Sequence, residues 1–180
     1  MLEARMRAVR GIALDVDGVL TDGGVFVGRD GAEFKRFSVL DGPAIHWCRG
    51  VGLELAIVSG RASPATTTRA AELGIEAVYQ GVRDKATQVS TWAAENGLSL
   101  AEVMYVGDDH IDLPVFEIVG VCVAPANAEA ELRARADYVT ERRGGDGALR
   151  EAIEWLLGGT GRLAGAVERY MAGTRGSEGS

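Results

Sequence analysis

The sequence has few of the residues that zinc, redox and disulfide sites use. Its 180 residues include two histidines and two cysteines, Cys48 and Cys122. Neither cysteine lies in a cluster of cysteine or histidine residues, so a zinc site, a thiol nucleophile and a disulfide framework are not expected. Both cysteines lie among apolar residues, which predicts small core residues in a protein of a reducing compartment.

Long apolar runs and an excess of basic residues are also missing. No stretch approaches the roughly 20 apolar residues of a membrane-spanning helix. The charged segment 1–10 lacks the apolar core of a secretion signal, so we expect a cytoplasmic protein. The net charge of −7 disfavours nucleic acid and anionic membranes as partners. It does not exclude an anionic small molecule, because a metal ion and a few local cations can outweigh the global field.

What the sequence does contain is a regular alternation of short apolar runs and helical patterns. We expect strands at 12–14, 54–58, 77–79, 103–106, 121–124 and 138–139. We expect helices at 41–51, 64–73, 84–96, 111–118, 126–134, 151–157 and 163–171. Such alternation predicts an α/β fold, a doubly wound parallel sheet covered by helices on both faces. The expected domain spans 1–172, and 173–180 is expected to be a disordered tail.

A β-hairpin is expected at about 24–37, after the first strand. Its two short apolar strands flank an Asp30-Gly31 turn. It presents more apolar surface than an isolated two-stranded hairpin can bury, from Val25, Val27, Phe34 and Phe37. The hairpin can therefore pack on its own domain or on other subunits, and the residues alone leave both open.

Polar residues follow three of the expected strands directly. Asp15, Ser59 and Asp108 each come just after an apolar run, and parallel sheets bind ligands beyond the carboxyl ends of their strands. Asp17 lies two residues after Asp15, so the two carboxylates can converge on one site. Two close carboxylates are costly unless a cation lies between them or one carries a proton. Either solution is chemically useful, as a Mg²⁺ site or as a general acid.

The segment 15–21, Asp-Val-Asp-Gly-Val-Leu-Thr, resembles the first signature of the haloacid dehalogenase phosphatase superfamily. The resemblance covers about residues 11–150. The three later signatures follow in the family's order, at Ser59 in Ile-Val-Ser-Gly-Arg, at Lys85 in Arg-Asp-Lys-Ala and at the pair Asp108-Asp109. A further carboxylate of the family corresponds to Asp112.

This resemblance implies a Mg²⁺-dependent phosphomonoesterase that forms an aspartyl-phosphate. Asp15 would be the nucleophile, and Asp17 the general acid and base. Ser59 and Lys85 would hold the phosphoryl group. The family's Mg²⁺ ligands correspond to the carboxylates of Asp15 and Asp108 and the backbone carbonyl of Asp17, with Asp109 and Asp112 supporting them.

Two other classes of protein remain alternatives. A response-regulator receiver domain also combines aspartates, Mg²⁺, a hydroxyl and a lysine on a doubly wound sheet. It places its acidic pair and its phosphoacceptor on different strands, so the Asp15-x-Asp17 pair favours the phosphatase. The phosphatase-like domain of vertebrate CMP-sialic acid synthetases also resembles this chain. A non-catalytic oligomerisation module of that kind could lose catalytic carboxylates, and here all are present.

The spacing of the signatures leaves no room for a cap domain over the site. The segment 18–58 holds the hairpin and one helix, and 60–84 holds one helix and one strand. The capless pattern and the segments 79–81, 135–140 and 144–148 closely resemble the 3-deoxy-D-manno-octulosonate (KDO) 8-phosphate phosphatase family. That resemblance implies a cytoplasmic homotetramer in lipopolysaccharide sugar synthesis. Its hairpins would form a central barrel, with active sites near the subunit interfaces.

The substrate end of the expected site departs from the family pattern. The differences lie at Leu40, Pro43, Ala44 and Asp146, and they leave a nine-carbon sialic-acid-type phosphate as an alternative to KDO 8-phosphate. Gly60, Arg61 and Lys35 are expected to bind the substrate. Arg61 can bind a sugar-acid carboxylate through two parallel hydrogen bonds or simply anchor its own loop. Lys35 lies on the hairpin, where it is either solvated or brought to a neighbour's site.

Overall fold

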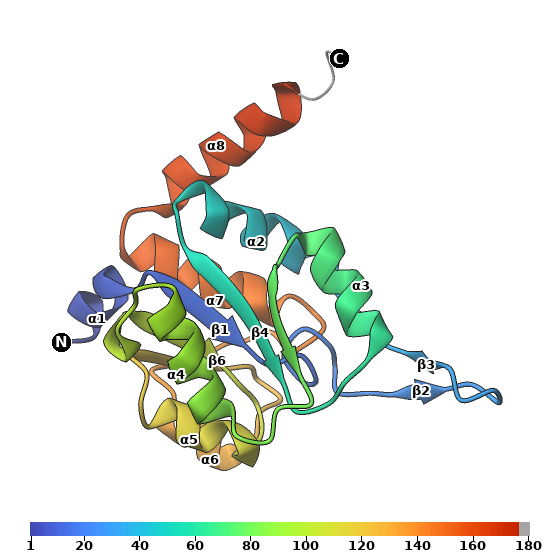
Figure 1. Cartoon of the computed structure of the whole chain (residues 1–180). Helices are drawn as coiled ribbons and strands as arrows, with labels where there is room; N and C mark the ends of the chain where they lie inside the picture. Colours follow the sequence, from blue (N-terminus) through green and yellow to red (C-terminus); the bar gives the residue numbers. More distant parts are fainter. Residues whose placement is uncertain (177–180) are drawn as a thin grey trace.

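Six parallel strands form one sheet in the computed structural model of this chain, which describes residues 1–176 and the side chains of residues 1–173. The strand order is β5-β4-β1-β6-β7-β8, with β1 at the centre (Figure 1). The strands are β1 (Gly11–Leu14), β4 (Glu54–Ser59), β5 (Ala77–Gln80), β6 (Val103–Val106), β7 (Val121–Ala124) and β8 (Tyr138–Val139). The predicted doubly wound α/β fold is confirmed.

Helices cover both faces of the sheet. One face carries α1 (Leu2–Ala8), α2 (Asp41–Gly50), α3 (Pro64–Leu73), α7 (Ala148–Gly159) and α8 (Leu163–Gly176). The other carries α4 (Lys85–Glu95), α5 (Leu113–Phe116) and α6 (Ala130–Arg135). Alternate residues of β1 feed the two cores, because Ile12 and Leu14 belong to the first cluster and Ala13 to the second. Short 3₁₀ turns, η1 (Leu100–Glu102) and η2 (His110–Asp112), precede β6 and α5.

Several expected boundaries were wrong. The helix α1 was not expected at all, and the helix expected at 111–118 is split into η2 and α5. The helix expected at 126–134 begins only at Ala130, because the Asn127 side chain bonds the Gly18 carbonyl and the Gly144 N–H and holds this segment as a loop. The helix α8 continues to Gly176, beyond the end expected at 171, and residues 177–180 of the expected tail lie outside the described residues.

Two packing contacts hold α8 against α2. The ring of Tyr170 stacks on His46 with centroids 5.8 Å apart, and Arg169 Nη1 donates to the Gly50 carbonyl at 3.1 Å. Those contacts stabilise a helix whose glycines would make it weak in isolation.

Both Cys48 and Cys122 are free and buried, as expected. Within residues 1–176, none of the helices combines the length and apolar character needed to cross a membrane.

The carboxylate of Asp41 serves a different helix from the one expected. It was expected to be the N-cap of α2, but α2 already includes Asp41 and its own N-cap is Leu40. Asp41 Oδ1 instead accepts a hydrogen bond of 2.9 Å from the backbone N–H of Arg150 in the first turn of α7. An N–H of that turn has no partner within its own helix, so Asp41 links the starts of two neighbouring helices.

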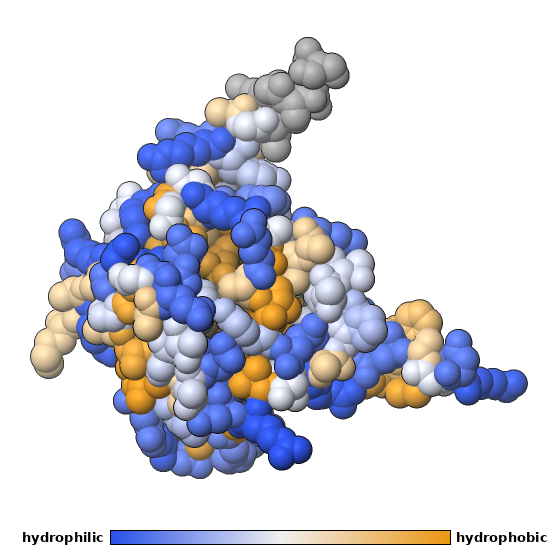
Figure 2. Space-filling model, in the orientation of Figure 1, coloured by the Kyte–Doolittle hydropathy of each residue, from blue (hydrophilic) through white to orange (hydrophobic). Residues whose placement is uncertain are grey.

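The hairpin forms as expected and projects away from the sheet and its helices (Figure 1). Its strands β2 (Phe26–Val27) and β3 (Glu33–Phe34) pair antiparallel, with Phe26 opposite Phe34. Apolar side chains gather on this projection (Figure 2), where Phe26, Val27 and Phe34 are 61%, 71% and 61% exposed. Phe37 was wrongly assigned to this surface, because it bridges to Thr21 and packs against the core.

Candidate active site

A pocket of about 430 Å³ lies at the carboxyl ends of β1, β4 and β6. Every predicted site residue lines it except Asp112 and Lys35, which lie directly behind it and bond to residues of its wall. Asp15 and Ser59 stand at the ends of β1 and β4, Lys85 opens α4, and Asp108 follows β6. The common edge predicted from strand order therefore brings these side chains together.

The turn after β1 is shaped by close backbone approaches. Gly18 has a φ of +83°, and a Cβ there would lie 1.8 Å from Asp108 Oδ2. Gly144 of the glycine-rich loop approaches equally closely, since its Cβ would lie 1.9 Å from the Gly18 carbonyl oxygen. Asn127 ties the same two loops together with hydrogen bonds of 2.9 and 2.6 Å. Glycine is required where these segments touch.

Lys85 is buried between two carboxylates, although it lies in the first turn of a helix. Its Nζ donates to Asp15 Oδ2 at 2.6 Å and to Asp112 Oδ1 at 2.7 Å. Burial opposes the lysine's charge, but the two carboxylates outweigh it and raise the pKa of Lys85. A permanently charged ammonium therefore faces the pocket, where it can neutralise a phosphoryl group.

Asp112 is saturated with hydrogen-bond donors. Its Oδ1 also accepts from the Tyr105 hydroxyl at 2.7 Å, and its Oδ2 accepts from the backbone N–H groups of Asp108 and Asp109 at 2.9 and 3.2 Å. The side chain thus fixes both Lys85 and the loop that carries Asp108.

Three carboxylates have the geometry of a cation site. One oxygen each of Asp15, Asp108 and Asp112 lies within 4.8 Å of the other two. Burial raises the pKa of Asp108 to about 8, with Asp15 and Asp112 adding to the shift, and burial raises that of Asp15 to about 6. The buried Asp108 Oδ1 has no hydrogen-bond partner. An oxygen-coordinated divalent cation such as Mg²⁺ would relieve both conditions, so the residues fit that ion.

The carboxylates around this cluster differ in whether their oxygens are free to coordinate a cation. Asp112 already receives four donors, whereas Asp108 Oδ1 is free to coordinate. The side chain of Asp17 turns to Lys35, which donates to Asp17 Oδ1 at 2.7 Å. The contribution of Asp17 through its backbone carbonyl stays a prediction.

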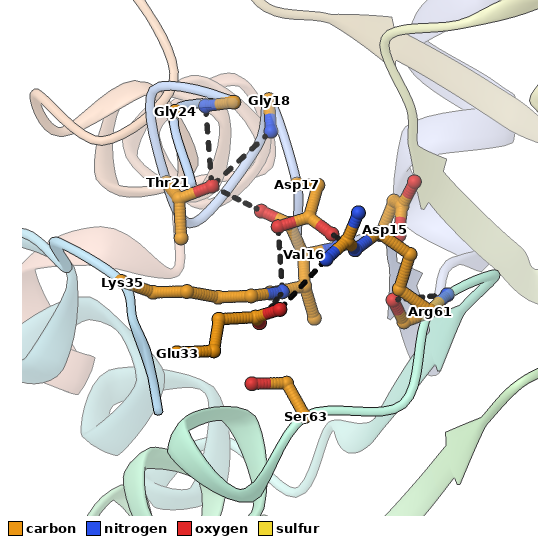
Figure 3. A network of polar contacts seen from close by, with 12 residues as sticks. Asp15, Val16, Asp17, Gly18, Thr21, Gly24, Glu33, Lys35, Arg61 and Ser63 are labelled. Atoms are coloured by element: carbon orange, nitrogen blue, oxygen red, sulfur yellow. Dashed lines mark hydrogen bonds and ion pairs between the residues drawn. The ribbon is translucent and has the colours of Figure 1, made fainter. Parts of the chain in front are cut away.

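Asp17 belongs to a ring of four charged side chains (Figure 3). Lys35 and Arg61 approach it from opposite sides, Arg61 Nε lying 3.7 Å from Asp17 Oδ2. Glu33 closes the ring, with Oε2 2.7 Å from Arg61 Nη2 and Oε1 3.8 Å from Lys35 Nζ. Lys35 is not solvated, because its side chain is 0% exposed and contacts Asp17 of its own chain. Arg61 reaches past its own loop to these carboxylates.

Three side chains that organise this site were not predicted from the sequence: Glu33, Tyr105 and Asn127. In the sequence, Glu33 looks like an ordinary charged residue of the hairpin, and Tyr105 looks like one more apolar residue of a strand. Asn127 was placed in a helix, although it follows β7 at the same edge as the other site residues. That position after a parallel strand was the one signal that could have identified it.

The profile of haloacid dehalogenase-like hydrolases matches residues 67–151. The parallel sheet and the acidic pocket at its carboxyl edge define the same class. The KDO 8-phosphate phosphatase KdsC of Escherichia coli strain K12 is 43% identical over 160 residues, 89% of this chain and 85% of the relative.

Solved structures agree with these matches. KDO 8-phosphate phosphatase from Yersinia pestis superposes with a TM-score of 0.88 at 38% identity, over 91% of this chain and 89% of that one. The Moraxella catarrhalis enzyme, solved with magnesium ion, phosphate ion and KDO, gives 0.89 at 33% identity, over 94% and 97%. This chain therefore belongs to the KDO 8-phosphate phosphatase family.

Proposed function

We propose that this protein is a Mg²⁺-dependent phosphomonoesterase that hydrolyses KDO 8-phosphate to KDO and inorganic phosphate. The observation that carries the proposal is the buried Lys85 held between Asp15 and Asp112, with Asp108 in the same pocket. The relatives named above act on that substrate, and the Moraxella enzyme holds magnesium, phosphate and KDO together.

Mg²⁺, held by Asp15, Asp108 and the Asp17 backbone carbonyl, would supply positive charge that screens the phosphate dianion from the carboxylate nucleophile. Asp15 attacks phosphorus in line and forms an aspartyl-phosphate. Asp17 protonates the leaving alkoxide and later takes a proton from the attacking water. Lys85 and Ser59 hold the equatorial oxygens of the phosphoryl group. Asp112 and Asp109 keep the loop of Asp108 in place.

We also propose that the protein assembles into a homotetramer and is located in the cytoplasm. The exposed Phe26, Val27 and Phe34 form an apolar patch at the end of a projecting hairpin, which suits burial against other subunits. A homotetramer built on the hairpins would place each open pocket near a neighbour, in line with one domain and no cap. A cytoplasmic location stays a prediction, which fractionation of producing cells would check.

A phosphatase screen tests the substrate. Purified protein is assayed for phosphate release from KDO 8-phosphate, a nine-carbon sialic-acid-type phosphate and neutral sugar phosphates, with and without Mg²⁺. The proposal predicts the highest kcat/KM for KDO 8-phosphate and no turnover without the metal. A higher value for the nine-carbon phosphate would support the second candidate, which the departures at Leu40, Pro43, Ala44 and Asp146 keep open. No turnover of any phosphate would support a non-catalytic module.

A further inference from the structure

The cations available to a substrate in this pocket are already paired. Among the described residues, Lys85 and Arg61 supply the positive side chains of the pocket wall. Lys85 is bound to Asp15 and Asp112 and faces the phosphoryl position. Arg61 is therefore left to meet a second anionic group of the substrate, and its Nη2 is occupied by Glu33.

The contact between Glu33 and Arg61 is easily exchanged. Glu33 Oε2 accepts one short hydrogen bond, from Arg61 Nη2, while its Oε1 is buried with no hydrogen-bond partner and lies 3.8 Å from Lys35 Nζ. The Ser63 hydroxyl and Arg61 both lower the pKa of the Glu33 carboxylate. It is carried by β3, a strand of two residues on the projecting hairpin, where it lies opposite Val27 of β2 (Figure 1). Moving the Glu33 side chain breaks few contacts. Asp17, the other carboxylate beside Arg61, must keep its place because the proposed proton transfers need it.

We propose that Glu33 is a specificity-determining residue that occupies Arg61 in place of the substrate's carboxylate and competes with it for the guanidinium. The inference rests on the proposed function, because it needs a substrate that carries a carboxylate. A sugar-acid phosphate replaces the Glu33 carboxylate by its own, so the charge around Arg61 stays balanced. A neutral sugar phosphate cannot make this exchange. After hydrolysis, the return of Glu33 to Arg61 displaces the carboxylate of the departing sugar acid.

The two possible roles of Glu33, as a competitor for Arg61 or as an anchor of Arg61, predict opposite changes in sugar-acid affinity when its charge is removed. If Glu33 only held Arg61 in place, removing its charge would weaken sugar-acid binding. If Glu33 competes, Glu33→Gln should tighten binding of KDO to the Mg²⁺-loaded enzyme by about tenfold, measured by titration calorimetry. The ratio of kcat/KM for KDO 8-phosphate to that for ribose 5-phosphate should rise in the same direction. Glu33→Ala should act likewise, because the effect comes from the lost carboxylate.

Two comparisons make the test specific. Glu72→Gln removes an equivalent carboxylate from an arginine, since Glu72 Oε2 lies 3.0 Å from Arg69 Nη1 outside the pocket, and it should leave KDO binding unchanged. In an Arg61→Met background, Glu33→Gln should no longer tighten binding, because the contested cation is gone.

The outcomes separate this inference from the proposed function. A wild-type enzyme that prefers KDO 8-phosphate, with Glu33→Gln binding KDO equally or more weakly, overturns the competitor role alone. A wild-type enzyme that shows no preference for the acid overturns the proposed substrate and this inference together. If Glu33→Gln still tightens KDO binding in the Arg61→Met background, the competitor role of Glu33 is overturned as well.

Discussion

The Nζ atom of Lys85 and the Oδ1 atom of Asp112 lie 2.7 Å apart with both side chains 0% exposed. Lys85 lines the pocket and Asp112 lies behind it, at a depth where a lysine without carboxylates would lose its proton or destabilise the fold. Asp112 also accepts from Tyr105 and from two backbone N–H groups. Asp112 thus supports both the buried ammonium of Lys85 and the loop that carries Asp108.

Replacing Asp112 by asparagine should damage stability and activity together. Four donors point at its two oxygens, and an amide would turn its own N–H groups toward some of them. We expect the free energy of unfolding to fall by about 3 kcal/mol, and kcat/KM to fall ten- to a hundredfold, by roughly the amounts known for buried ion pairs and metal-site supports. Denaturant unfolding and phosphate release measure both. Glu72→Gln, at an exposed carboxylate outside the pocket, should change stability by less than about 0.5 kcal/mol. Equal effects of the two variants would contradict this role.

Binding of Mg²⁺ should release a proton near neutral pH. Burial raises the pKa of Asp108 to about 8, so its carboxyl group is mostly protonated at pH 7 before the metal binds. The cation needs the carboxylate, so apparent affinity should rise with pH up to about 8. Calorimetry at pH 7 in two buffers of different ionisation enthalpy should give different heats. Asp108→Asn should abolish both binding and proton release. Identical heats in the two buffers would show that no proton is released.

The charge of Asp41 should make stability depend on pH. Burial raises its pKa from 3.8 to about 6, against the weaker opposing effects of the Arg150 N–H and nearby arginines. The folded state therefore holds the proton more tightly, and this contribution to stability, present below about pH 4, is lost as pH rises through 6. Asp41→Asn keeps an acceptor for Arg150 and should stabilise the protein by about 3 kcal/mol at pH 8, with little effect at pH 4. A gain that is independent of pH would refute the assignment.

Charge placed on the hairpin should dissociate the proposed tetramer. Val25→Asp with Val27→Asp would bury unpaired carboxylates at a subunit interface. Light scattering should then report a smaller particle than the wild type. Ile118→Asp, at another exposed apolar residue, should leave the mass unchanged. A wild-type protein with the mass of one chain would end the tetramer proposal.

The sheet and the position of the pocket could be predicted because both depend on local patterns. Apolar runs such as 103–106 gave the strands, and the polar residues after them gave the carboxyl edge. Gly74, with a φ of +61°, ends α3 where a glycine was expected to end it.

The remaining features depend on contacts between distant residues. Asp41 bonds to Arg150, and Asn127 bonds to Gly18 and Gly144, which no local pattern reveals. Glu33 of the hairpin and Arg61 of the loop after β4 pair although they are 28 positions apart in the chain. The helix start expected at 126 and the N-cap role expected for Asp41 were wrong for the same reason, since these side chains serve distant segments.

We propose above that Asp15 is the nucleophile of a KDO 8-phosphate phosphatase. Phosphate release from KDO 8-phosphate by the wild type and by Asp15→Asn, each with Mg²⁺, tests it most directly. Asparagine is a poor nucleophile of nearly the same shape, so the loss should reach several orders of magnitude while thermal unfolding shows a folded protein. Activity of Asp15→Asn within tenfold of the wild type would contradict the aspartyl-phosphate route.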